Sequence, residues 1–181
     1  MITEKEAVRI SRFLSLVLRH QPETIGLMLD ENGWADVNLL IEKCNQQGVA
    51  LNRELIEHVV ATNTKKRFSF NEQKDLIRAN QGHSIEVDLA LSSQVPPEIL
   101  FHGTAERFVS PIKEHGLIKQ QRQHVHLSAE ESTAVQVGQR HGKPFVFSVL
   151  TGQMHQDGFV FYLSDNGVWL TDHVPAKYLS F

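Results

Sequence analysis

The sequence lacks the features of secreted, membrane and disulfide-stabilised proteins. Its 181 residues include a single cysteine, Cys44, and no apolar run approaches the roughly 20 residues that a membrane helix needs. One cysteine cannot form an internal disulfide or a CxxC pair, which excludes a disulfide framework and a cysteine-based zinc site. The first residues, MITEKEAVRI, lack the apolar core of a signal peptide. We therefore expect a cytoplasmic protein in a reducing compartment, with no membrane contact.

Strong charge and the common phosphate-binding motifs are also missing. The net charge of −3 excludes a polycation, so nucleic acid would have to bind a local basic patch. There is no GxGxxG or Walker loop, and no GxSxG serine-nucleophile motif. What is present is 41% hydrophobic and 22% charged residues, a balance typical of a folded globular protein.

The pattern along the chain predicts an α+β protein with two lobes. Residues 1–80 show apolar residues at helical spacing in three stretches, then alternation that indicates a β-hairpin, which together describe a winged-helix-like lobe. Residues 81–97 read as a connector with one short strand at 85–89. Residues 98–181 alternate strands and helices, as expected of a small mixed α/β lobe. The predicted helices cover residues 3–21, 37–47, 52–63, 106–115 and 128–141; the predicted strands cover 67–70, 75–79, 99–102, 125–127, 145–150, 159–163 and 168–171.

Candidate phosphate-binding residues occur in the first lobe. Arg19 and His20 lie at the carboxyl end of the first helix, where cations also favour the helix dipole without any further role. In the hairpin, Arg67 and Ser69 share one strand face while Phe68 and its neighbour Phe70 share the other. The phenylalanines are expected in the core, so Arg67 faces outward or into a cleft, where it could bind phosphate.

The second lobe has a polar cluster at residues 121–128. His124 and His126 project to the same face of a predicted strand, but zinc needs three or four ligands and no partner stands at a recognisable spacing, so we expect no metal. Ser128 is explained as a helix cap. Upstream, His102 and Gly103 end a strand in a tight turn where a backbone could approach a ligand. Several arginines and histidines without a carboxylate pair favour a phosphate-handling cleft between the lobes.

Seven motifs follow one another along nearly the whole chain. They are Ser11-x-x-Leu14-Ser15-x-x-Leu18-Arg19-His20-x-Pro22, Gly33-Trp34, Lys66-Arg67-Phe68, Ile77-Arg78-Ala79-x-Gln81-Gly82-His83-Ser84, Phe101-His102-Gly103-Thr104, Arg122-x-His124-Val125-His126-Leu127-Ser128 and Asn166-Gly167-Val168-Trp169-Leu170-Thr171. In this order they resemble the RNA 2′-phosphotransferase family, also called tRNA 2′-phosphotransferases.

The resemblance implies a winged-helix-like RNA-binding lobe and an ADP-ribosyltransferase-like lobe that binds NAD as co-substrate, without a metal. The family removes an internal 2′-phosphate that a ligase leaves at a splice junction, as in tRNA splicing. The RNA 2′-phosphate attacks C1″ of the nicotinamide ribose, and the ribose 2″-hydroxyl of this ADP-ribosylated RNA then attacks phosphorus. The products are 2′-hydroxyl RNA, nicotinamide and ADP-ribose 1″,2″-cyclic phosphate. By resemblance, the catalytic residues are Arg19, His20, Arg67 and Arg122.

By resemblance, the NAD-binding residues lie in the second lobe. His102, His126 and Val168 occupy positions where the wider superfamily often carries His, Tyr and Glu. The missing glutamate argues against a protein-modifying enzyme, because a phosphate acceptor brings its own negative charge. Three further NAD contacts are expected on grounds of backbone proximity and hydroxyl chemistry, at Gly103, Thr104 and Ser128.

Two alternatives stay open at this point. One is an ADP-ribosyltransferase that acts on other phosphorylated ends of RNA, DNA or small molecules. The other is a non-catalytic module that senses NAD or ADP-ribose. In the leading interpretation the partners are RNA with an internal 2′-phosphate, read with little base preference, and NAD, and the protein is a monomer.

Overall fold

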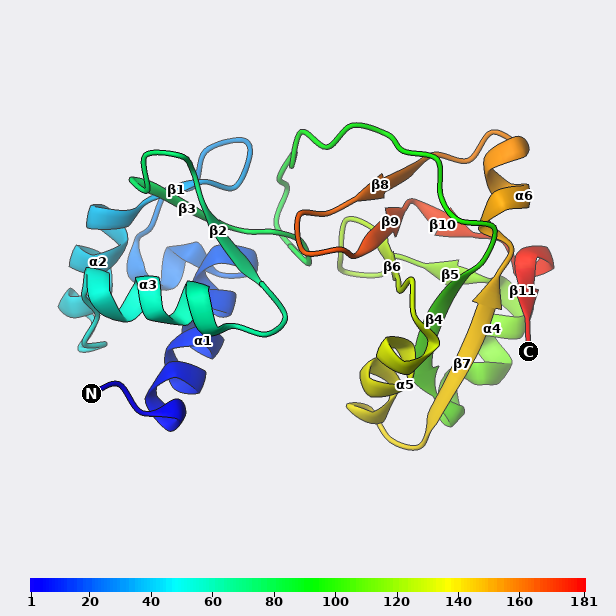
Figure 1. Ribbon diagram of the computed structural model, residues 1–181, viewed down its shortest axis with the longest axis horizontal. Coiled ribbons are helices and arrows are strands. Elements are labelled where there is room, and N and C mark those ends of the chain that lie inside the picture. The colour runs from blue at the N-terminus through cyan, green and yellow to red at the C-terminus, as the bar shows by residue number, and fades with distance from the viewer. The chain divides into compact units, whose positions relative to one another are not determined.

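The computed structural model describes residues 1–181 and divides into two compact units, Met1–Ala90 and Leu91–Phe181 (Figure 1). The boundary falls inside the predicted connector. The strand predicted at residues 85–89 is wrong: Val87 and Leu89 are buried as the alternation suggested, but the only ladder-like contact is one hydrogen bond from Asp88 N–H to the Glu31 carbonyl. None of the helices is both long and apolar enough to cross a bilayer.

Three capped helices form most of the first unit, and their predicted positions are confirmed to within a few residues. Helix α1 (Glu4–Arg19) begins after Thr3, whose hydroxyl accepts from Glu6 N–H at 3.2 Å. It ends before Pro22, which starts a 3₁₀ turn, η1 (Pro22–Ile25). The side chains of Asp36 and Asn52 cap the other two in the same way. These are α2 (Val37–Gln46) and α3 (Arg53–Thr62).

A small antiparallel sheet completes the first unit. The predicted hairpin is confirmed as β2 (Phe68–Phe70) and β3 (Leu76–Ala79), with Ser69 opposite Arg78. A two-residue strand, β1 (Ala35–Asp36), pairs with the other edge of β3, giving the order β1-β3-β2. The sheet's apolar face and the helices enclose one core. Its fully buried members include Ile10, Leu14, Val17, Leu18, Val37, Leu40, Ile56 and Ile77.

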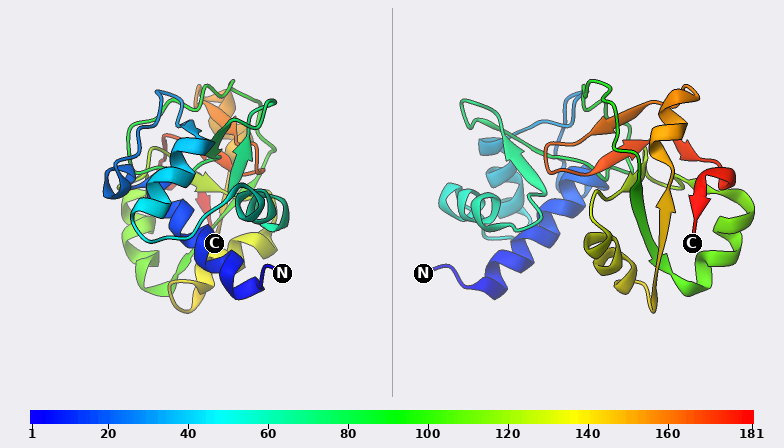
Figure 2. Two further views of the ribbon diagram at one scale, coloured as in Figure 1. Left: turned by 90° about the vertical axis from the view of Figure 1, so that its left-hand side faces the viewer. Right: turned by 45° about the vertical axis from the view of Figure 1, so that its right-hand side comes forward.

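The second unit is built from short antiparallel strands with helices around them (Figure 2). One sheet has the order β11-β7-β4 and another the order β6-β9-β8. A backbone bridge between Phe101 and Ser128 joins β4 to β6. The strands are β4 (Leu100–Ala105), β5 (Leu117–Ile118), β6 (Val125–Leu127), β7 (Pro144–Val149), β8 (Phe161–Leu163), β9 (Trp169–Thr171), β10 (His173–Val174) and β11 (Leu179–Ser180), and the helices are η2 (Glu106–Phe108), α4 (Val109–His115), α5 (Glu131–Gln139), α6 (Thr151–Gln156) and η3 (Ala176–Tyr178).

The structure corrects three predictions for this unit. His102 and Gly103 do not end a strand in a tight turn, because β4 continues through both residues to Ala105 and pairs with β7 along its whole length. Ser128 does not cap α5: the helix begins three residues later, Glu130 stands at its N-cap, and the backbone of Ser128 is used in the bridge to Phe101. Residues 106–115 form a 3₁₀ turn followed by a short helix instead of one continuous helix. The sequence also gave no signal for α6 or for the two-residue strands β5, β10 and β11, because such short elements show no periodicity.

Helix α5 lies unusually close to β4 because glycines stand at both surfaces. A Cβ on Gly103 would overlap the carbonyl group of Ala134 in the helix, and a Cβ on Gly138 would lie 2.6 Å from the Thr104 carbonyl oxygen. Ala134 itself is fully buried. The absence of side chains at the two glycines therefore sets the distance between helix and strand.

We predict that Gly103→Ala destabilises the second unit. The added methyl group overlaps backbone atoms of α5, which can relieve the clash only by moving as a whole, and overpacking of this kind typically costs about 1–3 kcal/mol. Denaturant unfolding followed by circular dichroism measures the loss. Gly167→Asn is the control, since Gly167 has φ +81°, a conformation that asparagine tolerates, and open space around it. Equal stability of Gly103→Ala and the control would contradict this account of the packing.

Candidate functional site

The end of α1 presents Arg19 and His20 in a fixed setting. The helix stops at this point because Pro22 follows, so both side chains project from its last turn. Ser84 contacts both residues: its N–H donates to the Arg19 carbonyl at 3.0 Å, and its hydroxyl oxygen lies 2.8 Å from Nδ1 of His20. The imidazole is therefore held by a hydroxyl group 64 residues away in the sequence.

Asn80, a few residues before Ser84 in the chain, holds the backbone of Arg67. The Asn80 N–H donates to the Arg67 carbonyl at 2.9 Å, and the Asn80 side-chain amide donates to the Lys66 carbonyl at 2.7 Å. Asn63 accepts from the Arg67 N–H at 3.3 Å. Residues Asn80–Ser84, which we name the clamp segment, thus connect the entrance of the β2–β3 hairpin to the end of α1. This one segment therefore contacts three of the four predicted catalytic residues, through the backbone of Arg19 and Arg67 and the ring of His20.

Gly82 in the middle of the clamp segment allows the chain to pass along the Arg19 guanidinium. A Cβ at this position would make ordinary van der Waals contact with Arg19, 3.6 Å from Nε and Cζ, so the requirement for glycine comes from the backbone φ of +86°. Both Nε and Nη2 of Arg19 are buried. The guanidinium therefore lies against backbone on one side, which restricts its rotamers.

His83, in the same segment, is a buried histidine that carries no charge near neutral pH. Only 1% of its surface is exposed, and burial, together with the charges of Arg19, Arg78 and His20, lowers its pKa to about 4. Arg78 is stacked on Trp34, with its guanidinium carbon 4.5 Å from the ring centroid. Burial also lowers the pKa of Arg67, but a guanidinium stays protonated at physiological pH.

In the second unit, three predicted residues form a connected row. Nη1 of Arg122 lies 3.0 Å from Nδ1 of His126. The backbone carbonyl of His126 in turn lies 3.0 Å from Nδ1 of His102, so this nitrogen is the one that carries hydrogen. Burial lowers the pKa of His102, and the hydrogen bond to His126 partly offsets that effect. The bridge between Phe101 and Ser128 brings β4 next to the end of β6, which allows this contact between the His102 ring and the His126 backbone.

One face of the β6-β9-β8 sheet carries the remaining polar candidates. His124 and His126 alternate with the buried Val125 and Leu127, as predicted. The ring of His124 lies 5.7 Å from that of Tyr162, and burial is the main reason that its pKa is lowered. Continuing the Leu127–Trp169 register by one residue places Ser128 opposite Val168 on the same face as His126.

Three of the predicted NAD-binding residues have local structural roles. Gly103 and Thr104 lie in β4 beneath α5, where Thr104 is 7% exposed and the missing side chain of Gly103 is required by the helix. Val168 closes the β8–β9 hairpin through hydrogen bonds with Ser164 in both directions. The packing under α5 accounts for the glycine at position 103 without a ligand, whereas the contacts of Val168 are through its backbone. NAD binding by the three residues stays a prediction.

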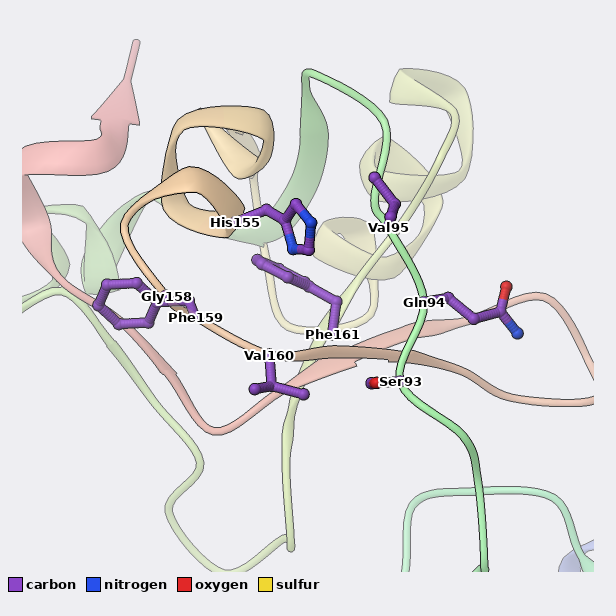
Figure 3. Close-up of a pocket in the computed structure, with 8 residues that line it drawn as sticks. All are labelled: Ser93, Gln94, Val95, His155, Gly158, Phe159, Val160 and Phe161. Carbon is purple, nitrogen blue, oxygen red and sulfur yellow. The ribbon is translucent and has the colours of Figure 1, made fainter.

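The second unit has a pocket that does not include these site residues. A cavity of about 240 Å³ is bordered mainly by apolar side chains and lies next to α6 and β8 (Figure 3). None of the predicted site residues lines it. The lining residues are Ser93, Gln94, Val95, His155, Gly158, Phe159, Val160 and Phe161. No group of three or more His, Cys, Asp or Glu side chains in the chain is arranged to hold a metal ion. The candidate site is therefore defined by its polar side chains and their hydrogen bonds.

Comparison with known proteins assigns a family to this arrangement. The family model "RNA 2′-phosphotransferase, Tpt1 / KptA family" matches residues 5–173. A probable RNA 2′-phosphotransferase of Flavobacterium johnsoniae is 58% identical over 180 residues, 99% of each chain. One of Rhodopirellula baltica is 53% identical over 182 residues, covering 100% of this chain and 99% of its own. The chain belongs to the RNA 2′-phosphotransferase family, as the motif order predicted.

Sequence reasoning assigned no individual role to four residues that shape the first unit's cluster. Gly82, His83 and Ser84 belong to the motif Ile77-Arg78-Ala79-x-Gln81-Gly82-His83-Ser84, in which Asn80 is the unspecified position, but nothing in the local pattern shows that this segment meets the end of α1 and the entrance of the hairpin. The local signal is the density of Gly, His and Ser after a strand, which by itself indicates a connector.

We predict that His83 makes the protein less stable as the pH falls from about 6.5 to about 4. The unfolded chain takes up a proton near pH 6.5, while the folded protein resists protonation until about pH 4, so acid favours unfolding in this window. The full difference corresponds to about 3 kcal/mol. Thermal unfolding at a series of pH values should show a flatter profile for His83→Gln, which cannot titrate. His58→Gln is the control in the same unit, and a His83→Gln profile as steep as that of the control would contradict the prediction.

Proposed function

We propose that this protein removes an internal 2′-phosphate from RNA with NAD as co-substrate, giving 2′-hydroxyl RNA, nicotinamide and ADP-ribose 1″,2″-cyclic phosphate. The observation that supports this most directly is the clamp segment, which ties the end of α1, with Arg19 and His20, to the backbone of Arg67. Membership of the RNA 2′-phosphotransferase family gives the reaction class.

In this proposal Arg19 and Arg67 bind the RNA 2′-phosphate. Guanidinium groups offer paired N–H donors that match phosphate oxygens, and they stay charged whatever the local burial. A phosphate near neutral pH is already ionised and needs no general base to become a nucleophile. The requirement is for orientation and for stabilisation of charge on the non-bridging oxygens, and fixed cations provide both.

His20 has a more specific part in the proposal. Because its Nδ1 meets the Ser84 hydroxyl, the proposed contact with the phosphate is made through Nε2. A ring held in one orientation can donate its proton along a fixed direction. We therefore propose that His20 is a phosphate ligand and proton donor, and that Ser84 is a positioning residue for it.

The second unit is proposed to hold NAD. When bound, NAD supplies an electrophilic ribose carbon and nicotinamide as a leaving group. Arg122 and the imidazoles of His102 and His126 are suited to phosphate and ribose oxygens, and the hydroxyl of Ser128 is on the same strand face as His126. Gly103 and Thr104 would contribute backbone groups, because Thr104 is buried.

The element order supports the proposed nature of the lobes. The first unit runs α1-β1-α2-α3-β2-β3, which is three helices with a closing hairpin and an extra edge strand, the composition of a winged-helix domain. The second unit contains two joined antiparallel sheets with peripheral helices, which is compatible with an ADP-ribosyltransferase-like lobe. We propose these roles for the two units.

We predict that Arg19→Ala, Arg67→Ala and Arg122→Ala each lower kcat by about 10²–10³-fold, the usual cost of removing one preorganised donor to a charged transition state. The substrate is a short RNA with one internal 2′-phosphate, incubated with and without NAD, and the products are identified by mass spectrometry. Arg53→Ala in the first unit and Arg140→Ala in the second are matched controls, as both side chains lie outside the proposed site.

The product pattern separates the proposal from its alternatives. Release of ADP-ribose 1″,2″-cyclic phosphate and nicotinamide supports the proposed reaction. ADP-ribose left on RNA, or transfer to other phosphorylated ends, would indicate an ADP-ribosyltransferase instead. Binding of NAD or ADP-ribose by folded protein without any turnover would indicate a sensor.

We predict that Ser84→Ala lowers kcat by about tenfold and shifts its pH dependence, with a smaller effect on KM. Loss of the hydroxyl removes the hydrogen bond that orients His20, so proton transfer by the ring no longer follows one fixed direction. Ser84→Thr keeps a hydroxyl and should recover much of the activity. A pH profile for Ser84→Ala identical to that of the unmodified protein would show that Ser84 does not act through His20.

A further inference from the structure

Helix α1 has a basic stripe on the face that points away from the core. At 3.6 residues per turn, positions 5, 9, 12, 16 and 19 lie within about 40° of one direction. The helix presents Lys5, Arg9, Arg12 and Leu16 there, all exposed, before reaching Arg19. The core residues Ile10, Leu14, Val17 and Leu18 occupy the opposite side.

The exposed cations of this stripe are available for a partner. Lys5, Arg9 and Arg12 form no ion pair, whereas Arg53 on α3 lies 3.8 Å from Glu57. They border a shallow surface hollow together with Val8 and Glu4. Glu4 lies in the first turn of α1, where a carboxylate interacts favourably with the helix dipole. The positive charge of the stripe therefore lies between this first turn and Arg19 in the last turn.

The stripe stands out because the unit as a whole carries no excess of positive charge. The first 80 residues carry 11 basic and 11 acidic side chains, so non-specific attraction of RNA by the whole unit is weak. A segregated row of cations gives a local positive field within a unit that has no net positive charge. With a rise of 1.5 Å per residue, Arg12, Arg9 and Lys5 lie about 10, 15 and 21 Å along the axis from Arg19.

We propose that Lys5, Arg9 and Arg12 form a track for the phosphates of the RNA strand that flanks the 2′-phosphate. The proposal rests on the proposed function, since it takes Arg19 as the point where the 2′-phosphate binds. The row of cations matches the charge of a polynucleotide backbone and contains no group arranged to read bases. The preferred substrate is then an RNA that extends several nucleotides from the 2′-phosphate.

The test compares two substrates with the full-length protein. One is a 12-nucleotide RNA with a central 2′-phosphate, and the other is a dinucleotide with the same group. The unmodified protein should favour the long RNA in kcat/KM, and in K5Q/R9Q/R12Q this advantage should shrink about tenfold or more. K43Q/R53Q/K74Q removes the same charge from the same unit and should keep the advantage. Glutamine is a good helix former, so α1 should stay folded, which thermal unfolding checks.

A binding measurement keeps the test independent of turnover. Anisotropy of a labelled 12-nucleotide RNA over a salt series gives the slope of log K, the association constant, against log salt concentration. This slope is negative, and its magnitude should decrease by about 2 in K5Q/R9Q/R12Q if three phosphate contacts are lost. An unchanged slope overturns the track, as does equal loss of activity on both substrates. Loss of binding to anionic lipid vesicles in this variant, with the RNA slope unchanged, would assign the stripe to a membrane surface and also overturn it. Failure of the unmodified protein to turn over either RNA overturns the proposed function, while the slope still decides the track.

Discussion

The hydrogen bonds at the two ends of the clamp segment are the constraint on which the candidate site of the first unit depends. Asn80 binds the backbone around Arg67, and Ser84 binds the backbone of Arg19 and the ring of His20. Five residues thereby connect two elements that the chain visits far apart in sequence. Cationic side chains repel one another, and backbone contacts of this kind hold the elements that carry them against that repulsion. The clamp segment supplies those contacts without adding charge of its own.

The neutrality of His83 is part of the same arrangement. A protonated histidine under Arg19 and Arg78 would add a third positive charge in a buried place, and both burial and the neighbouring charges oppose this. The uncharged ring instead fills space beside Gly33, at which a Cβ would lie 3.3 Å from Nε2. The first unit therefore separates two kinds of histidine. His20 is held by the hydroxyl group of Ser84, whereas His83 is buried and packs as an uncharged ring.

The helices and the hairpin of the first unit could be predicted because their signals are local. Thr3 and Asn52 each precede an apolar periodic stretch, and both cap their helices as this position indicates, while Asp36 caps α2 in the same way. Ser128 shows where such reasoning fails, since a serine three residues before a glutamate fits a capping box, yet its backbone is taken by a strand from elsewhere in the unit. The contacts of Ser84 and of Gly103 could not be predicted either, because both depend on which segments the fold brings together. The motif order identified the family from the sequence, but the physical reasons for several of its residues appear only in the structure.

Glycine residues have different structural roles in the two units. In the second, Gly103 and Gly138 remove side chains so that α5 can lie against β4, and the polar row of Arg122, His126 and His102 forms where β4 meets β6. In the first, Gly82 adopts φ +86°, a conformation that favours glycine, where the clamp segment runs beside the Arg19 guanidinium. Glycine in the second unit thus serves the packing of a helix on a strand, while in the first it permits the backbone conformation of the segment beside a proposed phosphate ligand. A substitution at Gly82 therefore strains the backbone of the clamp segment, whereas one at Gly103 makes α5 and β4 overlap and lowers the stability of its unit.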